Sequence, residues 1–214
     1  IGASVQEIDQ AEKLLSYAVL KESGSIKAHG HLLNLRNGYY DLKTGQLISH
    51  NPSVISFNQL DVSYDPEAEC PFFKQFLEQV LGDDPGKIEV LQEYCGYILE
   101  PDNRFEAVLG AVGDGANGKG TLIKVLQGIL GSQNYSCIPL ERFGGRFELA
   151  FLQHQMANFS SEVLKQALIN GARFKEVVSG DEVRGEWKNG TVFKFRPRAK
   201  LFILMNHLPR FNES

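Results

Sequence analysis

The sequence has few cysteines, no long apolar run and no excess of basic residues. Its three cysteines, Cys70, Cys95 and Cys137, lie far apart among 214 residues. An odd number without paired spacing argues against a disulfide scaffold and against a zinc ribbon, and it favours a reducing compartment. No apolar run approaches the roughly 20 residues that cross a bilayer, so we expect no membrane span.

Positive charge is scarce overall but concentrated late in the sequence. The formal net charge is −4 and the isoelectric point is about 5.8, which excludes a protein that binds nucleic acid through its overall charge. Between Lys165 and Lys200, however, nine basic residues stand against four acidic ones. Any contact with DNA is therefore predicted in that stretch. The five histidines show no metal spacing, and we assign none a catalytic role.

The first hundred residues predict a mainly helical domain. Residues 4–20 have helical apolar spacing, short strands flank Asn37-Gly38 as in a β-meander, and amphipathic helices follow at roughly 71–81 and 86–99. Pro101-Asp102-Asn103 is typical of a linker. We therefore expect two domains, residues 1–101 and residues 102–214. The start at Ile1 has no basic leader, so we expect no signal peptide and a fragment of a longer chain.

From Phe105 the pattern becomes α/β. Apolar runs at 106–112, 156–159 and 200–205 predict buried parallel strands, and helices are predicted at 119–130 and 163–178. Two further strands, 183–188 and 191–196, flank Asn189-Gly190, a strong hairpin signal. Together these elements predict an open, doubly wound sheet.

A glycine-rich loop follows the first of these strands. It reads Gly113-Asp114-Gly115-Ala116-Asn117-Gly118-Lys119-Gly120-Thr121. The spacing is that of a phosphate loop (P-loop): glycines let successive backbone N–H groups point at the β-phosphate, and Lys119 adds a positive charge. The alternative, a turn that binds no ligand, is disfavoured by the strand before the loop and the helix after it. The sequence therefore predicts nucleotide binding.

One position departs from the P-loop pattern. The residue after the lysine is usually Ser or Thr, whose hydroxyl binds Mg²⁺, but here it is Gly120. Thr121 comes one residue later, which moves its side chain about 100° around a helix. Either Thr121 still reaches the metal or water replaces it, so the affinity for Mg²⁺ is the property in question.

Two polar residues complete the predicted site. Glu162 follows an apolar segment and is a candidate to hold Mg²⁺ or polarise water; alternatively, it caps the next helix. Asn206 ends the apolar run 201–205 and is a candidate to orient the attacking water; alternatively, it is a turn residue before Pro209.

The hairpin is the candidate DNA-binding element. A basic tip beside an aromatic ring can contact phosphates and stack on a base. The residues predicted to bind DNA are Lys175, Arg184, Trp187 and Lys188. Trp187 can equally pack on its own domain.

Residues 105–210 resemble the motor of superfamily-three helicases, in the branch of phage and plasmid primase-helicases. The similarity lies in the phosphate loop with Asn before Gly-Lys, in Asn206-His207-Leu208-Pro209-Arg210 and in residues 175–181. Asn37-Gly38 through Gly96-Tyr97 resembles the helical domain that precedes this motor in phage and poxvirus primase-helicases.

The resemblance implies an AAA+-like P-loop ATPase that forms a ring, usually a hexamer, and threads single-stranded DNA from 3′ to 5′. It implies ATP and Mg²⁺, with Lys119 on the phosphates, Glu162 on the metal or water and Asn206 sensing the γ-phosphate. It also implies that Lys188 grips DNA, that a primase domain lies in the same or a partner chain, and that the host is a bacterial cytoplasm.

The resemblance also implies an arginine finger, which we expect beyond Asn206 and outside this sequence. Arg142, Arg146 and Arg210 are possible substitutes. We therefore expect residues 1–214 to bind ATP weakly, to hydrolyse it slowly and to form no stable ring.

Two other functions compete with a helicase motor. One is an initiator or loader ATPase that acts as a nucleotide switch on DNA without unwinding it. The other is a metabolic phosphoryl-transfer enzyme, which would need an acceptor pocket and a lid within residues 131–160.

Overall fold

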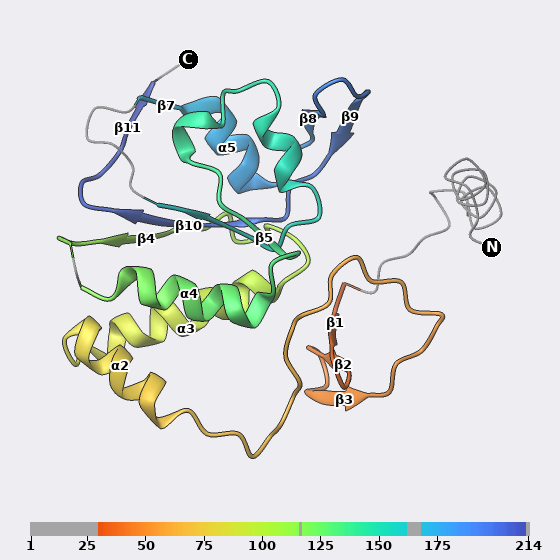
Figure 1. Cartoon of the computed structure of the whole chain (residues 1–214), viewed down its shortest axis with the longest axis vertical. Coiled ribbons are helices and arrows are strands. Elements are labelled where there is room, and N and C mark those ends of the chain that lie inside the picture. The colour runs from red at the N-terminus through yellow and green to blue at the C-terminus, as the bar shows by residue number, and fades with distance from the viewer. Residues whose placement is uncertain (1–29, 116, 162–167, 213–214) are drawn as a thin grey trace, which may run out of the picture. The chain divides into compact units, whose positions relative to one another are not determined.

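The computed structural model describes residues 30–115, 117–161 and 168–212. The chain divides into two compact units, one of Ile1–His29 and Asn51–Ser56 and one of Gly30–His50 and Phe57–Ser214. In the first unit, the described residues contain a turn in which the Val54 amide donates to the Asn51 carbonyl at 3.0 Å. The helix predicted at 4–20 lies outside the described residues. The strands and helices labelled in Figure 1 belong to the second unit.

Three antiparallel strands in the order β1-β2-β3 begin the second unit: β1 (Leu32–Leu35), β2 (Gly38–Asp41) and β3 (Gln46–Ile48). The predicted β-meander around Asn37-Gly38 is thereby confirmed. Leu33 and Leu35 point into the hydrophobic core because alternate side chains of a strand face the same side.

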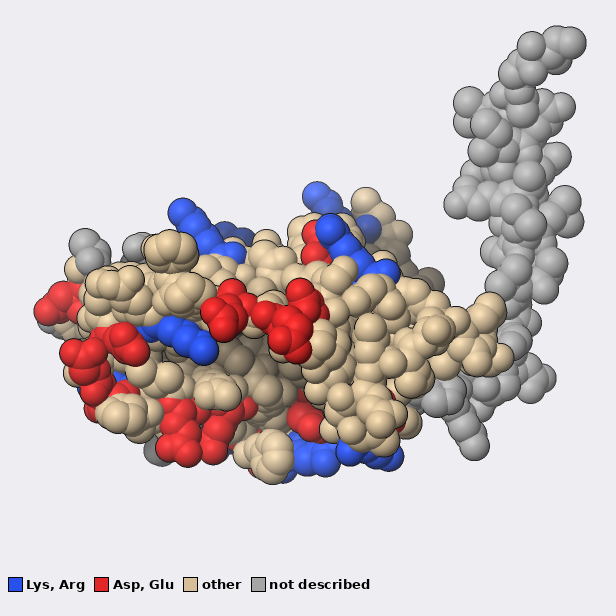
Figure 2. Space-filling view, turned by 90° about the horizontal axis from the view of Figure 1, so that it is seen from below, with Lys and Arg blue, Asp and Glu red and all other residues tan. Residues whose placement is uncertain are grey.

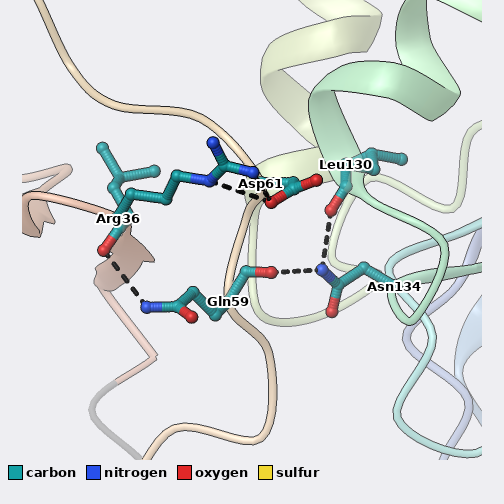
Figure 3. A network of polar contacts seen from close by, with 6 residues as sticks. Arg36, Gln59, Asp61, Leu130 and Asn134 are labelled. Carbon is teal, nitrogen blue, oxygen red and sulfur yellow. Dashed lines mark hydrogen bonds and ion pairs between the residues drawn. The ribbon is translucent and has the colours of Figure 1, made fainter.

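Asn134 ties the segment after the meander to helix α4 (Lys119–Leu130). Its side chain is buried, and its Nδ2 donates to the carbonyls of Gln59 at 2.6 Å and Leu130 at 2.7 Å (Figure 3). Its Oδ1 accepts from the side-chain Nδ2 of Asn58 at 2.8 Å. Because each of these groups is paired, burying the amide leaves no unmet hydrogen bond at these atoms.

Two helices follow, α2 (Pro71–Leu81) and α3 (Pro85–Leu99), as predicted. Asp84 begins α3 by accepting from the amides of Gly86 and Lys87. Leu91 and Tyr94 of α3 pack in the same core as Leu122 of α4, so this core includes residues on both sides of position 101. The two domains 1–101 and 102–214 stay a prediction. Among the described residues, none of the helices has the length and apolar character needed to cross a membrane.

A four-stranded parallel sheet forms the centre of the α/β part. Its order is β4-β10-β6-β5, with β4 (Leu109–Val112), β10 (Lys200–Met205), β6 (Ala157–Ser160) and β5 (Tyr135–Ser136). The three predicted strands are confirmed, and β5 was not predicted. The mixed α/β class is also confirmed.

Both faces of this sheet are covered. Phe202 of β10 packs with α3 and α4, whereas Leu201 and Ile203 pack in a second core with α5 (Gly171–Ser179). Figure 1 accordingly shows α3 and α4 on one side of β4 and β10, and α5 on the other. The second core also holds the 3₁₀ turns η2 (Leu140–Arg142) and η3 (Glu148–Leu152).

The helix predicted at 163–178 is wrong at its start. Residues 162–167 lie outside the described residues, and β7 (Leu168–Asn170) pairs in parallel with β11 (Arg210–Asn212). The helix begins only at Gly171, where the Asn170 side chain accepts from the Arg173 amide at 3.0 Å. Periodicity cannot reveal a strand whose partner lies some 40 residues later.

The predicted hairpin is confirmed. Strands β8 (Val183–Glu186) and β9 (Val192–Phe195) pair antiparallel around Asn189-Gly190. Asn189 has a φ of 62°, and the Gly190 amide donates to the Trp187 carbonyl at 2.8 Å. Asn and Gly are the residues that tolerate this left-handed backbone, which explains the turn.

Candidate functional site

The glycine-rich loop joins β4 to α4, as the sequence predicts. At its start, the Gly113 amide donates to the Met205 carbonyl at 3.2 Å, which holds the loop beside the end of β10. At its end, Gly118 has a φ of 83°, and a Cβ there would lie 2.5 Å from Val80 Cγ1 of α2. Only glycine meets both conditions without strain. Ala116 lies outside the described residues.

Lys119, the first residue of α4, folds its side chain back over the loop. Its ammonium donates to the Gly113 carbonyl, to the Asp114 carbonyl at 3.0 Å and to Asn117 Oδ1 at 2.9 Å. An ammonium has three N–H donors, and three oxygens of the loop accept them. The positive charge is therefore held where the backbone curls.

A cavity of about 460 Å³ lies against this loop. It is lined by Gly115, residues 117–121, Lys124, Ser161 and residues 204–206. Lys119 and Lys124 supply two positive charges, and no carboxylate stands among the described lining residues. A second cavity of about 700 Å³, which shares residues 117–119, is lined mainly by apolar side chains such as Val90 and Leu109. The first cavity therefore has the chemistry that an anionic ligand needs.

The structure brings several predicted site residues together. Lys119 and Thr121 line the cavity from α4, and Asn206 lines it from the position directly after β10. Polar residues just beyond the carboxyl ends of parallel strands are placed where ligands bind such sheets. Glu162 lies outside the described residues.

Two polar residues at this cavity were not predicted as site residues, Lys124 and Ser161. Lys124 lies three residues after Thr121 on α4, so helical spacing could have identified it as a neighbour. Ser161 follows β6 directly, at the same edge of the sheet as Asn206. Its hydroxyl is an acceptor and a donor, and the sequence distinguishes it poorly from the adjacent Ser160. Ser160 is buried, and its hydroxyl accepts from the Leu140 amide at 3.1 Å.

The fit to Mg²⁺ can be judged from the donor set. Mg²⁺ prefers oxygen ligands and keeps several waters. The hydroxyl-bearing residues Thr121 and Ser161 line the cavity, whereas Gly120 supplies no hydroxyl. Among the described residues, no group of three or more His, Cys, Asp or Glu side chains could hold a metal ion. Two hydroxyls are few of the oxygen ligands that Mg²⁺ takes, so at these described residues such an ion would keep most of its water.

The residues predicted to contact DNA lie at different places. Lys188 is exposed at the turn of the hairpin, and Lys175 is exposed on α5. Trp187 packs edge-on against Phe151 with ring centroids 5.2 Å apart and stacks on Phe193 at 6.0 Å. Its side chain is nevertheless 41% exposed, so packing and surface contact are compatible.

Charge is unevenly distributed over the surface. Figure 2 shows several groups of acidic side chains on the face that bears α2 and α3. The hairpin, in contrast, carries Arg184 and Lys194 at paired positions of β8 and β9. The Lys194 ammonium donates to Glu182 at 2.8 Å, so the hairpin bears charges of both signs.

Two family models match parts of the chain. A family described as "D5 N terminal like" matches residues 3–82, and a family of unknown function, DUF5906, matches residues 111–214. The first match supports the resemblance of the N-terminal part to the domain that precedes the motor in primase-helicases. No curated protein matches the sequence.

Solved structures of the NrS-1 C-terminal region share the fold. One apo structure has a TM-score of 0.61 and 17% identity. The match covers 95% of this chain and 51% of the chain in that structure. Two others have TM-scores of 0.57 and 0.55 with 19% and 20% identity, and each covers 69% of this chain. The chain spans only 37% to 51% of the lengths of these structures.

Proposed function

We propose that this chain is the nucleotide-binding part of an ATP-dependent DNA helicase or translocase that replicates a phage, a plasmid or an integrated mobile element. The observation that carries the proposal is one cavity lined by Lys119, at the start of α4, and by Asn206, at the end of β10. A P-loop fold of the AAA+ type would use these two positions for phosphate binding and for sensing the γ-phosphate.

Each residue has a distinct part in the proposed site. Lys119 and Lys124 bind phosphate oxygens, and loop amides donate to them. Asn206 orients the water that attacks the γ-phosphate. Thr121 and Glu162 would hold Mg²⁺, which neutralises phosphate charge when it is bound. Trp187 and Lys188 contact single-stranded DNA from the hairpin, and Lys175 and Arg184 bind the same strand.

The proposed assembly is a ring, usually a hexamer, in which a neighbouring subunit supplies an arginine to the site. A primase domain in the same or a partner chain and a bacterial cytoplasm complete the proposal. The metabolic phosphoryl-transfer alternative is disfavoured, since Leu140, Phe143 and Leu152 of the segment that would form a lid are buried in the core.

A nucleotide switch without unwinding is the second candidate. Gly120, where most P-loops have a hydroxyl, favours it because weaker Mg²⁺ binding slows hydrolysis more than it weakens nucleotide binding. Strand displacement by the full-length protein distinguishes the two: a motor unwinds a forked duplex and loses this activity in Lys188→Ala, whereas a switch does not unwind it.

The proposed site is tested by titrating a fluorescent ATP analogue into the chain. Lys119→Ala should weaken binding by about 2–4 kcal/mol, roughly 30- to 1,000-fold, because a charge on the phosphates is lost. Lys43→Ala, an exposed lysine in the turn between β2 and β3, is the control with the same charge change. Equal affinity of wild type, Lys119→Ala and Lys43→Ala would refute the site.

A further inference from the structure

A second polar pocket lies apart from the glycine-rich loop. It has a volume of about 280 Å³, and its lining residues include Gly144, Gly145, Arg146, Arg173, Arg184 and Glu186. The three arginines come from three separate segments: the loop between η2 and η3, helix α5 and strand β8. None of the residues that line the Lys119 cavity lines this pocket.

The guanidinium groups are only partly neutralised. Arg146 makes a two-bond ion pair with Glu186, Nε to Oε2 at 2.9 Å and a terminal nitrogen to Oε1 at 2.7 Å. The hydrogen bonds from Arg146, and in smaller part the charge of Arg184, hold the pKa of Glu186 below its ordinary value. Glu186 therefore stays ionised. Glu186 is the one carboxylate among the described lining residues and Glu176 pairs with Arg173 beside them, so three guanidinium groups and two carboxylates leave one net positive charge.

Arg173 is also held in place. Its guanidinium donates to Glu176 Oε2 at 2.8 Å, one turn further along α5. This ion pair is about 40% exposed at each side chain, so solvent screens it and the guanidinium keeps donors for another anion. An arginine fork binds phosphate through two parallel N–H donors, and holding it in advance lowers the entropy cost of binding.

Gly145 lines the pocket at a position where a side chain would collide with its neighbours. A Cβ on Gly145 would lie 2.8 Å from Glu148 Cγ and 3.0 Å from the Arg142 carbonyl, so a side chain does not fit there. The volume, well below that of the Lys119 cavity, suits one phosphate group rather than a whole nucleotide.

The pocket adjoins the hairpin. Arg184 lies on β8 directly opposite Lys194 of β9, and Lys188 stands at the turn of the same hairpin. A strand of DNA that follows the hairpin from its tip toward Arg184 meets the Lys188 ammonium and the Arg184 guanidinium, whereas Lys194 is paired with Glu182 at 2.8 Å. A nucleic-acid backbone, which carries a negative phosphate at every nucleotide, complements these positive groups in charge.

We propose that Arg146, Arg173 and Arg184 bind one phosphodiester group of single-stranded DNA, with Glu186 positioning Arg146. This inference rests on the proposed function. It adds a second contact with the DNA backbone, at a place other than the hairpin tip. It assigns Arg146 to DNA rather than to a neighbouring nucleotide site.

The test measures the binding of a fluorescent oligo(dT) to the chain by anisotropy at several salt concentrations. Arg173→Gln and Arg184→Gln should each weaken binding about five- to twentyfold. Each should also reduce the slope of log K against log salt concentration by about 0.7, the value for one lost phosphate contact. Arg36→Gln is the matched control, because Arg36 is an exposed arginine paired with Asp61 in the meander region. Wild-type affinity in Arg173→Gln and Arg184→Gln would overturn the proposal.

Two further arms separate the possible sources of the phosphate and the possible failures. Inorganic phosphate at matched ionic strength should not displace the oligonucleotide from wild type; displacement would make this a site for free phosphate and would overturn the proposal. ATP-analogue binding should be unchanged in Arg184→Gln. Equal ATP-analogue affinity of wild type and Lys119→Ala refutes the proposed function. Wild-type DNA affinity in Arg173→Gln and Arg184→Gln refutes only the pocket.

Discussion

The Tyr94 hydroxyl donates a hydrogen bond of 2.7 Å to the Leu201 carbonyl. Tyr94 lies on α3 and Leu201 on β10, which are separated by 107 residues in the sequence. Burial raises the pKa of the Tyr94 phenol well above its ordinary value, so it stays protonated and able to donate. Helix α3 is thereby attached to β10, the strand that directly precedes Asn206.

Tyr94→Phe should lower the free energy of unfolding by about 1–2 kcal/mol, because the buried Leu201 carbonyl loses a partner while the ring is kept. Urea denaturation monitored by circular dichroism measures this difference. One cooperative transition in both proteins is expected, since α3 and α4 share a core. An unchanged midpoint would show that this hydrogen bond contributes nothing to stability.

Lys200 gives stability an unusual pH dependence. Its side chain is buried, its ammonium donates to the Glu100 carbonyl at 2.6 Å, and it lies 4.9 Å from the centre of the Tyr97 ring. Burial, assisted by the charge of Arg198, lowers the pKa of Lys200 from 10.5 to about 7.

The unfolded chain therefore binds more protons at this site between pH 7 and 10.5, and the stability contributed there rises with pH across that range. Below about pH 7 both states are protonated, and the destabilisation is fully present. Lys200→Met should flatten this rise, whose limiting slope is about 1.4 kcal/mol per pH unit. Urea midpoints at pH 7, 8 and 9 test it. Parallel profiles for wild type and variant would contradict the low pKa.

Gly118→Ala should abolish ATP-analogue binding and lower the free energy of unfolding by about 1–3 kcal/mol, through the positive φ and the contact with Val80. Gly128→Ala is the matched control on α4: nothing lies within 4 Å of its added Cβ, and a helix interior favours alanine by up to about 1 kcal/mol. Adding Val80→Ala to Gly118→Ala should relieve the collision but not the backbone strain. Full recovery in that double variant would mean that φ is unimportant here.

Gly120→Ser should strengthen the Mg²⁺ dependence of nucleotide binding several-fold, because it places a hydroxyl directly after Lys119. A Cβ at Gly120 meets nothing within 4 Å, so the fold should tolerate the change. Titrating Mg²⁺ at a fixed concentration of ATP analogue measures the effect. If the two proteins respond identically, Gly120 is not the reason for a weak metal site.

The glycine-rich loop and its flanking elements could be predicted from the sequence because their determinants are local. Strand β4 begins later than expected, at Leu109, because Glu106 has a φ of 46° and its amide donates to the Asn103 carbonyl. An apolar run does not predict a turn that is stabilised by a hydrogen bond to the Asn103 carbonyl.

Long-range arrangements could not be predicted in the same way. Asn206 was placed correctly at the end of a strand, but its approach to Ser161 depends on the pairing of β10 with β6. The pocket around Arg146 and Arg184 likewise unites segments that are some 40 residues apart. Such meetings follow from tertiary packing, which residue spacing does not encode.

The contacts of Lys119 have a thermodynamic consequence. Since its three donors already have oxygen partners in Gly113, Asp114 and Asn117, an arriving phosphate swaps one partner for another instead of supplying the first. The Lys119 ammonium therefore adds to the affinity only the difference in free energy between its hydrogen bond to a neutral loop oxygen and its hydrogen bond to a charged phosphate oxygen. The Lys119 ammonium is thus held in position by Gly113, Asp114 and Asn117 before a phosphate binds, and giving up these partners offsets part of the free energy gained from the phosphate.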